Sequence, residues 1–218
     1  MPNFAVIGLG SFGFFVSKYL AERGFQVIAI DKTEARVNEV KPFVEKAVIA
    51  DATNKENLIN LGLQDMDAVV VSVGDAIDAS ILVVLYLKEL GVKRIIAKAM
   101  TLDHGKILDI IGATDIIFPE KDMAFRLAQS LDAPNVLDYL YLAPGYSIIE
   151  LAPPTSFLGK TLKQLDLRNK YGVQIIIIKE VVPENIIVVP KADHVIKDSD
   201  ILVAMGKDED LERIKKLK

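Results

Sequence analysis

The stretch Gly8-Leu9-Gly10-Ser11-Phe12-Gly13 decides the fold that this sequence predicts. It follows the apolar run at residues 4–7, which is typical of a strand, and it opens a helical pattern over residues 12–23. In such a G-x-G-x-x-G unit, the first glycine permits the tight turn and the second lets a pyrophosphate approach the backbone. The third lets the helix pack close to the sheet, and phosphate oxygens would bind the free N–H groups at the helix start.

The same strand–helix alternation continues through the first half of the chain. Strands are predicted at residues 4–7, 26–30, 47–50, 68–72, 94–99 and 115–118. Helices are predicted at residues 12–23, 33–41, 76–90, 102–111 and 119–131, with one more capped by residues 51–54 and ending at 61. The fully apolar strand at 68–72 is typical of a sheet covered by helices on both faces. The fold class predicted is therefore α/β, with a Rossmann-like doubly wound parallel sheet.

The pattern changes after a predicted break at Ala133-Pro134. A short apolar helix is predicted at residues 136–142, followed by the turn Ala143-Pro144-Gly145. Beyond it, strands are predicted at 147–151, 174–179, 186–189 and 201–205, with helices at 160–165 and 208–217. We therefore expect two domains, a nucleotide-binding domain over residues 1–141 and a small α+β domain over residues 142–218.

Composition excludes several classes of protein. Hydrophobic residues make up 51% of the 218 residues and charged residues 26%, so the chain is not disordered. It contains no cysteine, which excludes disulfides and thiolate metal sites. A net charge of −4 without a long basic run gives no sign of nucleic-acid binding. Neither a targeting segment nor a membrane span is apparent, so a soluble, cytoplasmic protein is expected.

An acidic residue supports the nucleotide interpretation of the glycine-rich turn. Asp31 ends the second strand, 18 residues after Gly13, and Lys32 follows it. A carboxylate at this position accepts hydrogen bonds from ribose hydroxyls and repels a 2′-phosphate, which disfavours NADP. In the alternative interpretation the glycines only form a tight turn and Asp31 only caps the next helix.

Other strand ends at the same edge of the sheet carry candidate ligand contacts. Ligands of open α/β sheets bind outside the carboxyl ends of the strands. The candidates there are Asp51-Ala52 after the third strand, Ser72-Val73-Gly74 after the fourth and Lys98 near the end of the fifth. Asp51 could contact the adenine side or only cap a helix, and Lys98 could neutralise phosphate or only extend to solvent.

The sequence lacks an obvious reaction centre beside this nucleotide site. His104, after the fifth strand, and His194, in a loop of the small domain, are interpreted as surface or loop histidines. No Tyr-x-x-x-Lys pair and no Ser/His/Asp constellation stands out. A non-enzymatic sensor is therefore expected. The alternatives are an NAD-dependent oxidoreductase with a reduced substrate domain, and a free-standing redox or nucleotide sensor.

Several motifs in order give a resemblance that covers essentially the whole chain. These motifs are Gly8 to Gly13, Asp31, Ala50-Asp51-Ala52-Thr53, Pro119-Glu120-Lys121-Asp122-Met123, Leu167-Arg168-Asn169-Lys170-Tyr171-Gly172 and Asp200 to Gly206. With them the sequence resembles the RCK (also called KTN) domain family, the KtrA/TrkA-type regulatory subunits of potassium uptake systems.

The resemblance implies a role in gating. It implies homodimers that assemble into an octameric ring on the cytoplasmic face of the cell membrane, beneath a KtrB/TrkH-like potassium-translocating subunit. It also implies that ATP and ADP, or NAD(H), bind the glycine-rich site and switch the ring between conformations. The helix from Pro119 would be the crossover helix exchanged between subunits, and residues 136–142 would complete the dimer contact.

The resemblance also implies roles for single residues. Many members carry an Arg after the second glycine that reaches the γ-phosphate; Ser11 stands here, which would pass that role to Lys98 or a metal. Glu120 would lie by the phosphates and help hold Mg²⁺ or Ca²⁺, or else be a first-turn carboxylate favoured by the helix dipole. Arg168, Ile175 and Pro190 would line a cyclic di-AMP cleft, or else be a surface, a core and a loop residue. The nucleotide-binding set is Gly8, Gly10, Ser11, Phe12, Gly13, Asp31, Lys32, Asp51, Ala52, Ser72, Val73, Gly74, Lys98 and Glu120.

Overall fold

The computed structural model describes residues 2–73, 76–132 and 136–217, which divide into two compact units, Met1–Glu120 and Lys121–Lys218. The predicted domain boundary after residue 141 stays a prediction. The predicted break at Ala133-Pro134 lies outside the described residues. Within the described residues, no helix is long and apolar enough to cross a membrane.

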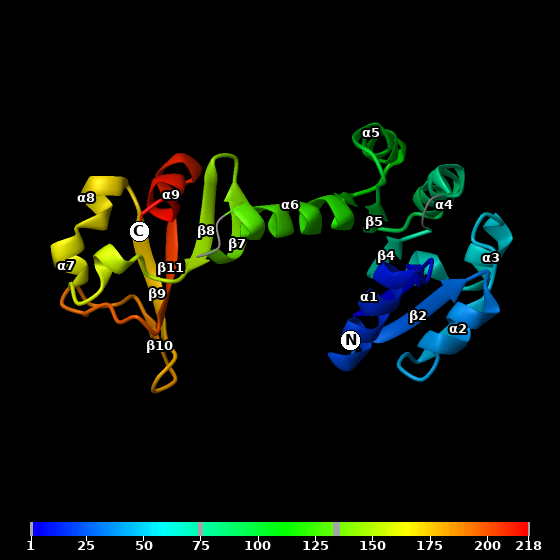
Figure 1. Ribbon diagram of the computed structural model, residues 1–218. Coiled ribbons are helices and arrows are strands. Elements are labelled where there is room, and N and C mark those ends of the chain that lie inside the picture. The colour runs from blue at the N-terminus through cyan, green and yellow to red at the C-terminus, as the bar shows by residue number, and fades with distance from the viewer. Residues whose placement is uncertain (1, 74–75, 133–135, 218) are drawn as a thin grey trace. The chain divides into compact units, whose positions relative to one another are not determined.

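Unit 1 is built on a six-stranded parallel sheet in the order β3-β2-β1-β4-β5-β6. Its strands are β1 (Asn3–Ile7), β2 (Gln26–Asp31), β3 (Lys46–Ile49), β4 (Ala68–Val71), β5 (Ile95–Lys98) and β6 (Asp115–Ile117). Its helices are α1 (Ser11–Glu22), α2 (Glu34–Val40), α3 (Lys55–Asn60), the 3₁₀ turn η1 (Leu63–Asp65), α4 (Ile77–Glu89) and α5 (Leu102–Ile111), and α6 (Pro119–Asp132) begins at its last residues (Figure 1).

Helices cover both faces of this sheet, because alternate residues of its strands are apolar on each side. Val6, Val27 and Ala29 pack with apolar residues of α1 and α2 in one buried cluster. Ala5 and Ile7 pack on the other face, in a cluster with apolar residues of α3, α4 and α5. The predicted doubly wound parallel sheet is confirmed. The strand order reverses between β1 and β4, which creates the switch point where ligands of such folds bind.

Unit 2 contains a five-stranded antiparallel sheet in the order β10-β9-β11-β8-β7. The strands are β7 (Val136–Ala143), β8 (Tyr146–Leu151), β9 (Gln174–Glu180), β10 (Asn185–Val188) and β11 (Asp200–Lys207). The helices are the 3₁₀ turn η2 (Thr155–Phe157), α7 (Leu162–Leu165), α8 (Leu167–Tyr171) and α9 (Asp208–Lys215) (Figure 1). A single apolar cluster lies between the sheet and these helices.

One predicted element is wrong. Residues 136–142 form strand β7, and not the dimerisation helix that we expected. A short apolar run carries no decisive period, so its partner decides its conformation. Here β7 forms a hairpin with β8 around Gly145, whose φ of +80° suits a tight turn. The Pro144-Gly145 dipeptide was the available turn signal.

Candidate functional site

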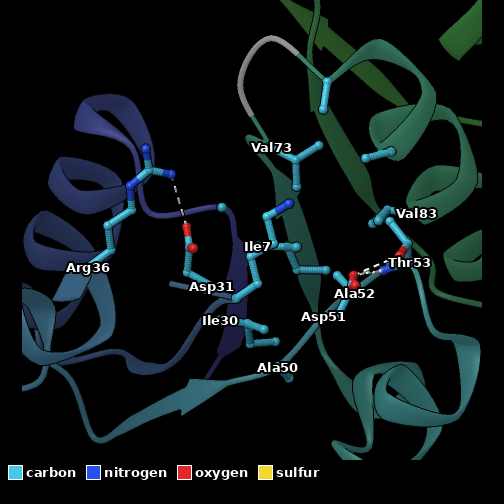
Figure 2. A pocket seen from close by; sticks show the side chains of 14 residues that line it. Ile7, Ile30, Asp31, Arg36, Ala50, Asp51, Ala52, Thr53, Val73 and Val83 are labelled. Atoms are coloured by element: carbon cyan, nitrogen blue, oxygen red, sulfur yellow. Dashed lines mark hydrogen bonds and ion pairs between the residues drawn. The ribbon is translucent and has the colours of Figure 1, made fainter. Parts of the chain in front are cut away.

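A pocket of about 500 Å³, partly open to solvent, lies at the switch point of the parallel sheet. It is formed where β1, β2, β3 and β4 end, beside the start of α4 (Figure 2). Its lining residues are Ile7, Gly8, Ile30, Asp31, Lys32, Arg36, Ala50, Asp51, Ala52, Thr53, Val73, Ala76, Ala79 and Val83. The walls are mostly small and apolar, with a few charged groups at the rim, as expected for a small-molecule site.

The three glycines of the opening motif have three different physical roles. Gly8 has φ +90°, and a Cβ placed on it would lie 2.2 Å from the Ser72 carbonyl oxygen, so β1 and β4 approach each other there. A Cβ on Gly13 would lie 1.9 Å from the Gly8 carbonyl oxygen, so α1 packs directly onto the turn. A Cβ on Gly10 would meet no atom within 4 Å. Gly10 therefore leaves open space immediately before α1.

The start of α1 is suited to binding an anion. The N-cap of α1 is Gly10, whose lack of a side chain leaves the first N–H groups of the helix without a side-chain cap. The first N–H groups of any helix have no intrahelical partner and lie at the positive end of its dipole. Ser11 is exposed at this end, whereas Phe12 packs into the cluster under α1. A phosphate group in the space beside Gly10 would be bound by these N–H groups.

Asp31 ends β2 and is 6% exposed. Its Oδ2 accepts a hydrogen bond from the Leu9 N–H at 2.7 Å, and its Oδ1 accepts one from the Thr33 N–H at 2.8 Å. Burial raises the pKa of Asp31, but these backbone hydrogen bonds and the Arg36 guanidinium more than offset it, so the pKa is lowered. The carboxylate therefore fixes the glycine-rich turn and stays ionised at the pocket wall.

Replacing Asp31 with asparagine is expected to destabilise the fold by about 1–3 kcal/mol at neutral pH, because an amide cannot accept both backbone N–H groups. The folded-state pKa of Asp31 is lowered, so its stabilisation is present above the unfolded value, about 3.9, and is lost as pH falls through the folded value. The difference in free energy of unfolding between wild type and variant, measured with urea, should therefore narrow below about pH 4.

The matched control is Asp67→Asn, because the Asp67 carboxylate accepts only the Asn3 N–H, at an exposed position. Asp67→Asn should lower the free energy of unfolding less than Asp31→Asn does. A difference between wild type and Asp31→Asn that widens in acid would contradict the role given to the carboxylate.

Arg36 is the charged residue of the pocket lining that sequence reasoning missed. It lies in the first turn of α2, and its guanidinium is 3.5 Å from the Asp31 carboxylate (Figure 2). Lys32 lines the same part of the pocket. An arginine five residues after the acid that ends β2 was the available signal, because α2 begins at the same edge of the sheet at which β2 ends. The two cations make this rim suited to an anionic or hydroxyl-rich group.

Asp51 lies at the opposite rim, after β3. Its Oδ1 accepts hydrogen bonds from the Thr53 N–H at 2.9 Å and the Thr53 hydroxyl at 2.7 Å (Figure 2). The hydrogen bonds from Thr53 lower its pKa. Its local turn uses Oδ1 of the carboxylate. Asp51 thus forms a local turn and lines the pocket, whereas the N-cap of α3 is Asn54, so the alternative interpretation of Asp51 as a helix cap is wrong.

The fourth wall comes from the end of β4 and the start of α4. Val73 lines the pocket, while Ser72 is buried behind Gly8. Gly74 lies outside the described residues. Ala76 and Ala79 add two small side chains to the wall. A flat aromatic base fits between such small apolar residues better than between bulky ones.

Lys98 and Glu120 lie together but not among the residues that line this pocket. Lys98 ends β5, Glu120 is the second residue of α6, and their side chains form an ion pair. The hydrogen bond from Lys98 lowers the pKa of Glu120. Among the residues that the structure describes, no group of three or more acidic or histidine side chains could hold a metal ion. Glu120 alone does not make a metal site.

Unit 2 contains a second pocket, of about 550 Å³ including space open to solvent, between α7, α8 and the start of β9. Arg168, Ile175 and Pro190 all line it, together with Lys163. The three residues predicted for a second-messenger cleft are thus neighbours. Ile175 is also part of the apolar core of unit 2, which agrees with its alternative interpretation as a core residue.

The two histidines differ from each other. His194 is in a loop of unit 2, as expected, with its Nε2 3.7 Å from the Asp200 carboxylate. The expectation of a surface or loop histidine is wrong for His104, which is 2% exposed in the first turn of α5. Neither histidine lines the pocket at the switch point.

Comparisons with known proteins decide the family. Residues 4–119 match the TrkA-N domain and residues 146–218 match the TrkA-C domain. The chain is 46% identical over 214 residues to Ktr system potassium uptake protein C of Bacillus subtilis (strain 168), covering 98% of this chain and 96% of that protein. The chain belongs to the KtrA/TrkA-type RCK family. Another family member, Ktr system potassium uptake protein A of the same organism, is 42% identical, covering 97% of this chain and 94% of its own length.

Solved structures show the same fold as this KtrA/TrkA-type chain. The GsuK channel superposes with a TM-score of 0.71 at 18% identity, over 99% of this chain and 39% of the channel's chain. A GsuK channel bound to NAD gives a TM-score of 0.54 at 20% identity, over 98% of this chain and 38% of the other. The chain thus spans well under half of these longer proteins. The RCK fold expected from the resemblance is confirmed.

Proposed function

We propose that this chain is the nucleotide-binding regulatory subunit of a Ktr/Trk-type potassium uptake system. The observation that carries the proposal is the pocket at the switch point, where the Asp31 carboxylate, bonded to the Leu9 N–H of the glycine-rich turn, meets a wall of small apolar residues. Its relatives are potassium uptake proteins, which favours a membrane potassium transporter as the partner.

The ligand that fits this pocket is an adenine nucleotide, either ATP/ADP or NAD(H). The base would lie between the small residues of β3 and α4, the ribose hydroxyls would reach Asp31, and the phosphates would reach the start of α1. A GsuK channel of the same fold is described as bound to NAD, which supports a dinucleotide. Lys98 is paired with Glu120, so recognition of a γ-phosphate by Lys98 would require this pair to open.

The proposed assembly is a homodimer that forms an octameric ring on the cytoplasmic face of the membrane. Four apolar side chains of α6 are exposed in the single chain, which favours an assembly in which another subunit covers this helix. They are Met123, Phe125, Leu127 and Leu131. A ring can switch only if a nucleotide has different binding free energies in two ring conformations. Static light scattering should therefore report a ring-sized particle, and a monomer would contradict this part of the proposal.

The proposal includes two further ligands, cyclic di-AMP and a divalent cation, and the described residues support the first better than the second. A cyclic di-AMP site is proposed at the unit 2 pocket, where the Arg168 guanidinium could pair with a phosphate. A Mg²⁺ or Ca²⁺ ion at Glu120 would need ligands beyond those that the described residues bring together. No step of the proposed switching is therefore assigned to a metal.

The oxidoreductase alternative requires a proton-transfer group beside the nicotinamide, and the described residues that line the pocket include neither histidine nor tyrosine. The relatives are potassium uptake proteins, which also disfavours it. Sustained oxidation of NADH with a carbonyl substrate would favour the alternative over a regulatory role.

Potassium flux into vesicles that contain the translocating subunit tests the proposed function. Adding the wild-type chain should make flux depend on the nucleotide supplied, with different rates for ATP, ADP and NADH. Adding the Gly10→Ala chain should give one rate with all three, because this variant is expected to lose the phosphate site. Flux that is independent of nucleotide with the wild-type chain, although nucleotide binds, would contradict gating.

A further inference from the structure

The buried histidine of unit 1 has a complete set of hydrogen bonds that the nucleotide pocket does not use. The Met100 N–H donates to Nδ1 of His104 at 3.2 Å, and Nε2 lies 2.7 Å from the Ser80 hydroxyl. Met100 belongs to the turn after β5, and Ser80 belongs to the first turns of α4. One side chain of α5 thus joins these two segments.

These contacts assign every proton around the imidazole. Because Nδ1 accepts the Met100 N–H, the ring proton is on Nε2 and is donated to the Ser80 oxygen. The Ser80 hydroxyl in turn donates to the Ile77 carbonyl at 2.9 Å. The network is therefore complete with a neutral ring. A second proton, on Nδ1, would face the Met100 N–H and break that hydrogen bond.

The network reaches the pocket through the start of α4. The Ser80 N–H donates to the Ala76 carbonyl at 3.0 Å, and Ala76 and Ala79 both line the pocket. Ser80 is thus hydrogen-bonded to Ala76 and directly follows Ala79 in the sequence. Its hydrogen bond to His104 fixes the position of this wall relative to the rest of the sheet edge.

We propose that His104 is a positioning residue of the nucleotide pocket, whose neutral ring holds the start of α4 in the binding conformation and whose protonation releases it. This inference rests on the proposed function. The consequence is a nucleotide affinity that decreases on acidification, because only chains with a neutral His104 have the wall in place.

Burial sets the direction of this dependence. It lowers the pKa of His104, because the charged imidazolium is disfavoured away from water. The charged groups on α4, β5, β6 and α5 itself are Asp78, Lys88 and Glu89 of α4, Lys98 of β5, Asp115 of β6, and Asp103, Lys106 and Asp109 of α5. The unfolded chain has a pKa of about 6.5, so the stability due to His104 is present above that value and falls as pH falls below it.

Calorimetric affinities for NAD⁺ and ADP at about pH 7.5 and pH 5.5 test the proposal. The informative variant is His104→Gln, because a glutamine amide can donate to Ser80 and does not titrate. Wild type should lose more affinity on acidification than this variant does, by at most about tenfold at pH 5.5. The control His194→Gln removes the other imidazole, far along the chain in unit 2, and should follow wild type. Equal pH dependence in wild type and His104→Gln would overturn the proposal.

Two measurements without nucleotide keep the inference separable from the proposed function. Nitrogen NMR of His104 should show an unprotonated Nδ1 at neutral pH, and an unprotonated Nε2 would overturn it. Hydrogen exchange at the Ser80 amide should accelerate at about pH 5.5 in wild type relative to His104→Gln, and equal protection would also overturn it. If neither nucleotide binds at either pH, the proposed function fails instead. Should His104→Gln not fold, Ser80→Ala replaces it, with reduced affinity already expected at neutral pH.

Discussion

Replacing Gly10 with alanine is expected to weaken adenine-nucleotide binding by about tenfold or more while the fold stays intact. The new methyl group would meet no protein atom within 4 Å, and the backbone at Gly10 (φ −64°, ψ −178°) suits alanine without strain. The methyl group would, however, occupy the space in front of α1 where a phosphate must sit. Losing one or two hydrogen bonds to a charged group, at about 1.5–3 kcal/mol each, corresponds to at least a roughly tenfold loss of affinity.

Isothermal titration with NADH and ADP measures this loss, and thermal unfolding measures the fold. The matched control is Gly206→Ala, the same substitution at a backbone conformation that alanine also tolerates, in unit 2. It should leave nucleotide affinity unchanged. It should lower the stability of the fold slightly, because the new Cβ would lie 3.1 Å from a methyl group of Val173. A Gly10→Ala chain that binds both nucleotides within threefold of wild type would place the phosphates elsewhere.

Replacing Gly13 with alanine is expected to produce the opposite pattern, a large loss of stability. Its Cβ would lie 1.9 Å from the Gly8 carbonyl oxygen, so α1 would have to move away from the turn. The contact is with backbone, which cannot rotate aside, and overpacking of this kind costs about 3 kcal/mol or more. For a chain of this length the melting temperature should drop by about 6–12 °C.

Differential scanning calorimetry measures this drop and can show whether the two units unfold separately. The loss should appear in the transition of unit 1, because Gly8 and Gly13 both belong to it. A Gly13→Ala chain with the wild-type melting temperature would show that α1 does not pack against the turn as described. The contrast with Gly10→Ala separates the binding glycine from the packing glycine.

The parallel sheet was predictable because its signals are local. Each strand is a short apolar run followed by turn and cap residues, and the glycine motif fixes the order of the first strand and helix. The same logic placed Gly8, Asp31, Asp51 and Val73 at one sheet edge, where they line a single pocket. A parallel sheet brings the ends of its strands together, so positions along the sequence were sufficient.

What the sequence could not supply depends on contacts between distant segments. Strand β7 resembled a helix because its conformation is decided by pairing with β8. For Lys98 the sequence left open a contact with phosphate or an extension to solvent, and its ammonium group pairs with Glu120, 22 positions away. His104 was predicted to be a surface or loop residue because its partners, Ser80 and Met100, come from segments that the local pattern does not connect to it. In each case a tertiary partner outweighed the local pattern.

Calorimetric titration of the full wild-type chain with NAD⁺, NADH, ADP and ATP tests the central claim most directly. The pocket at the switch point predicts saturable binding of at least one of these nucleotides, with one site per chain in unit 1. Binding should also raise the melting temperature, because a ligand that binds only the folded state stabilises it. No binding heat and no thermal shift with any of the four nucleotides would contradict a nucleotide site in this pocket.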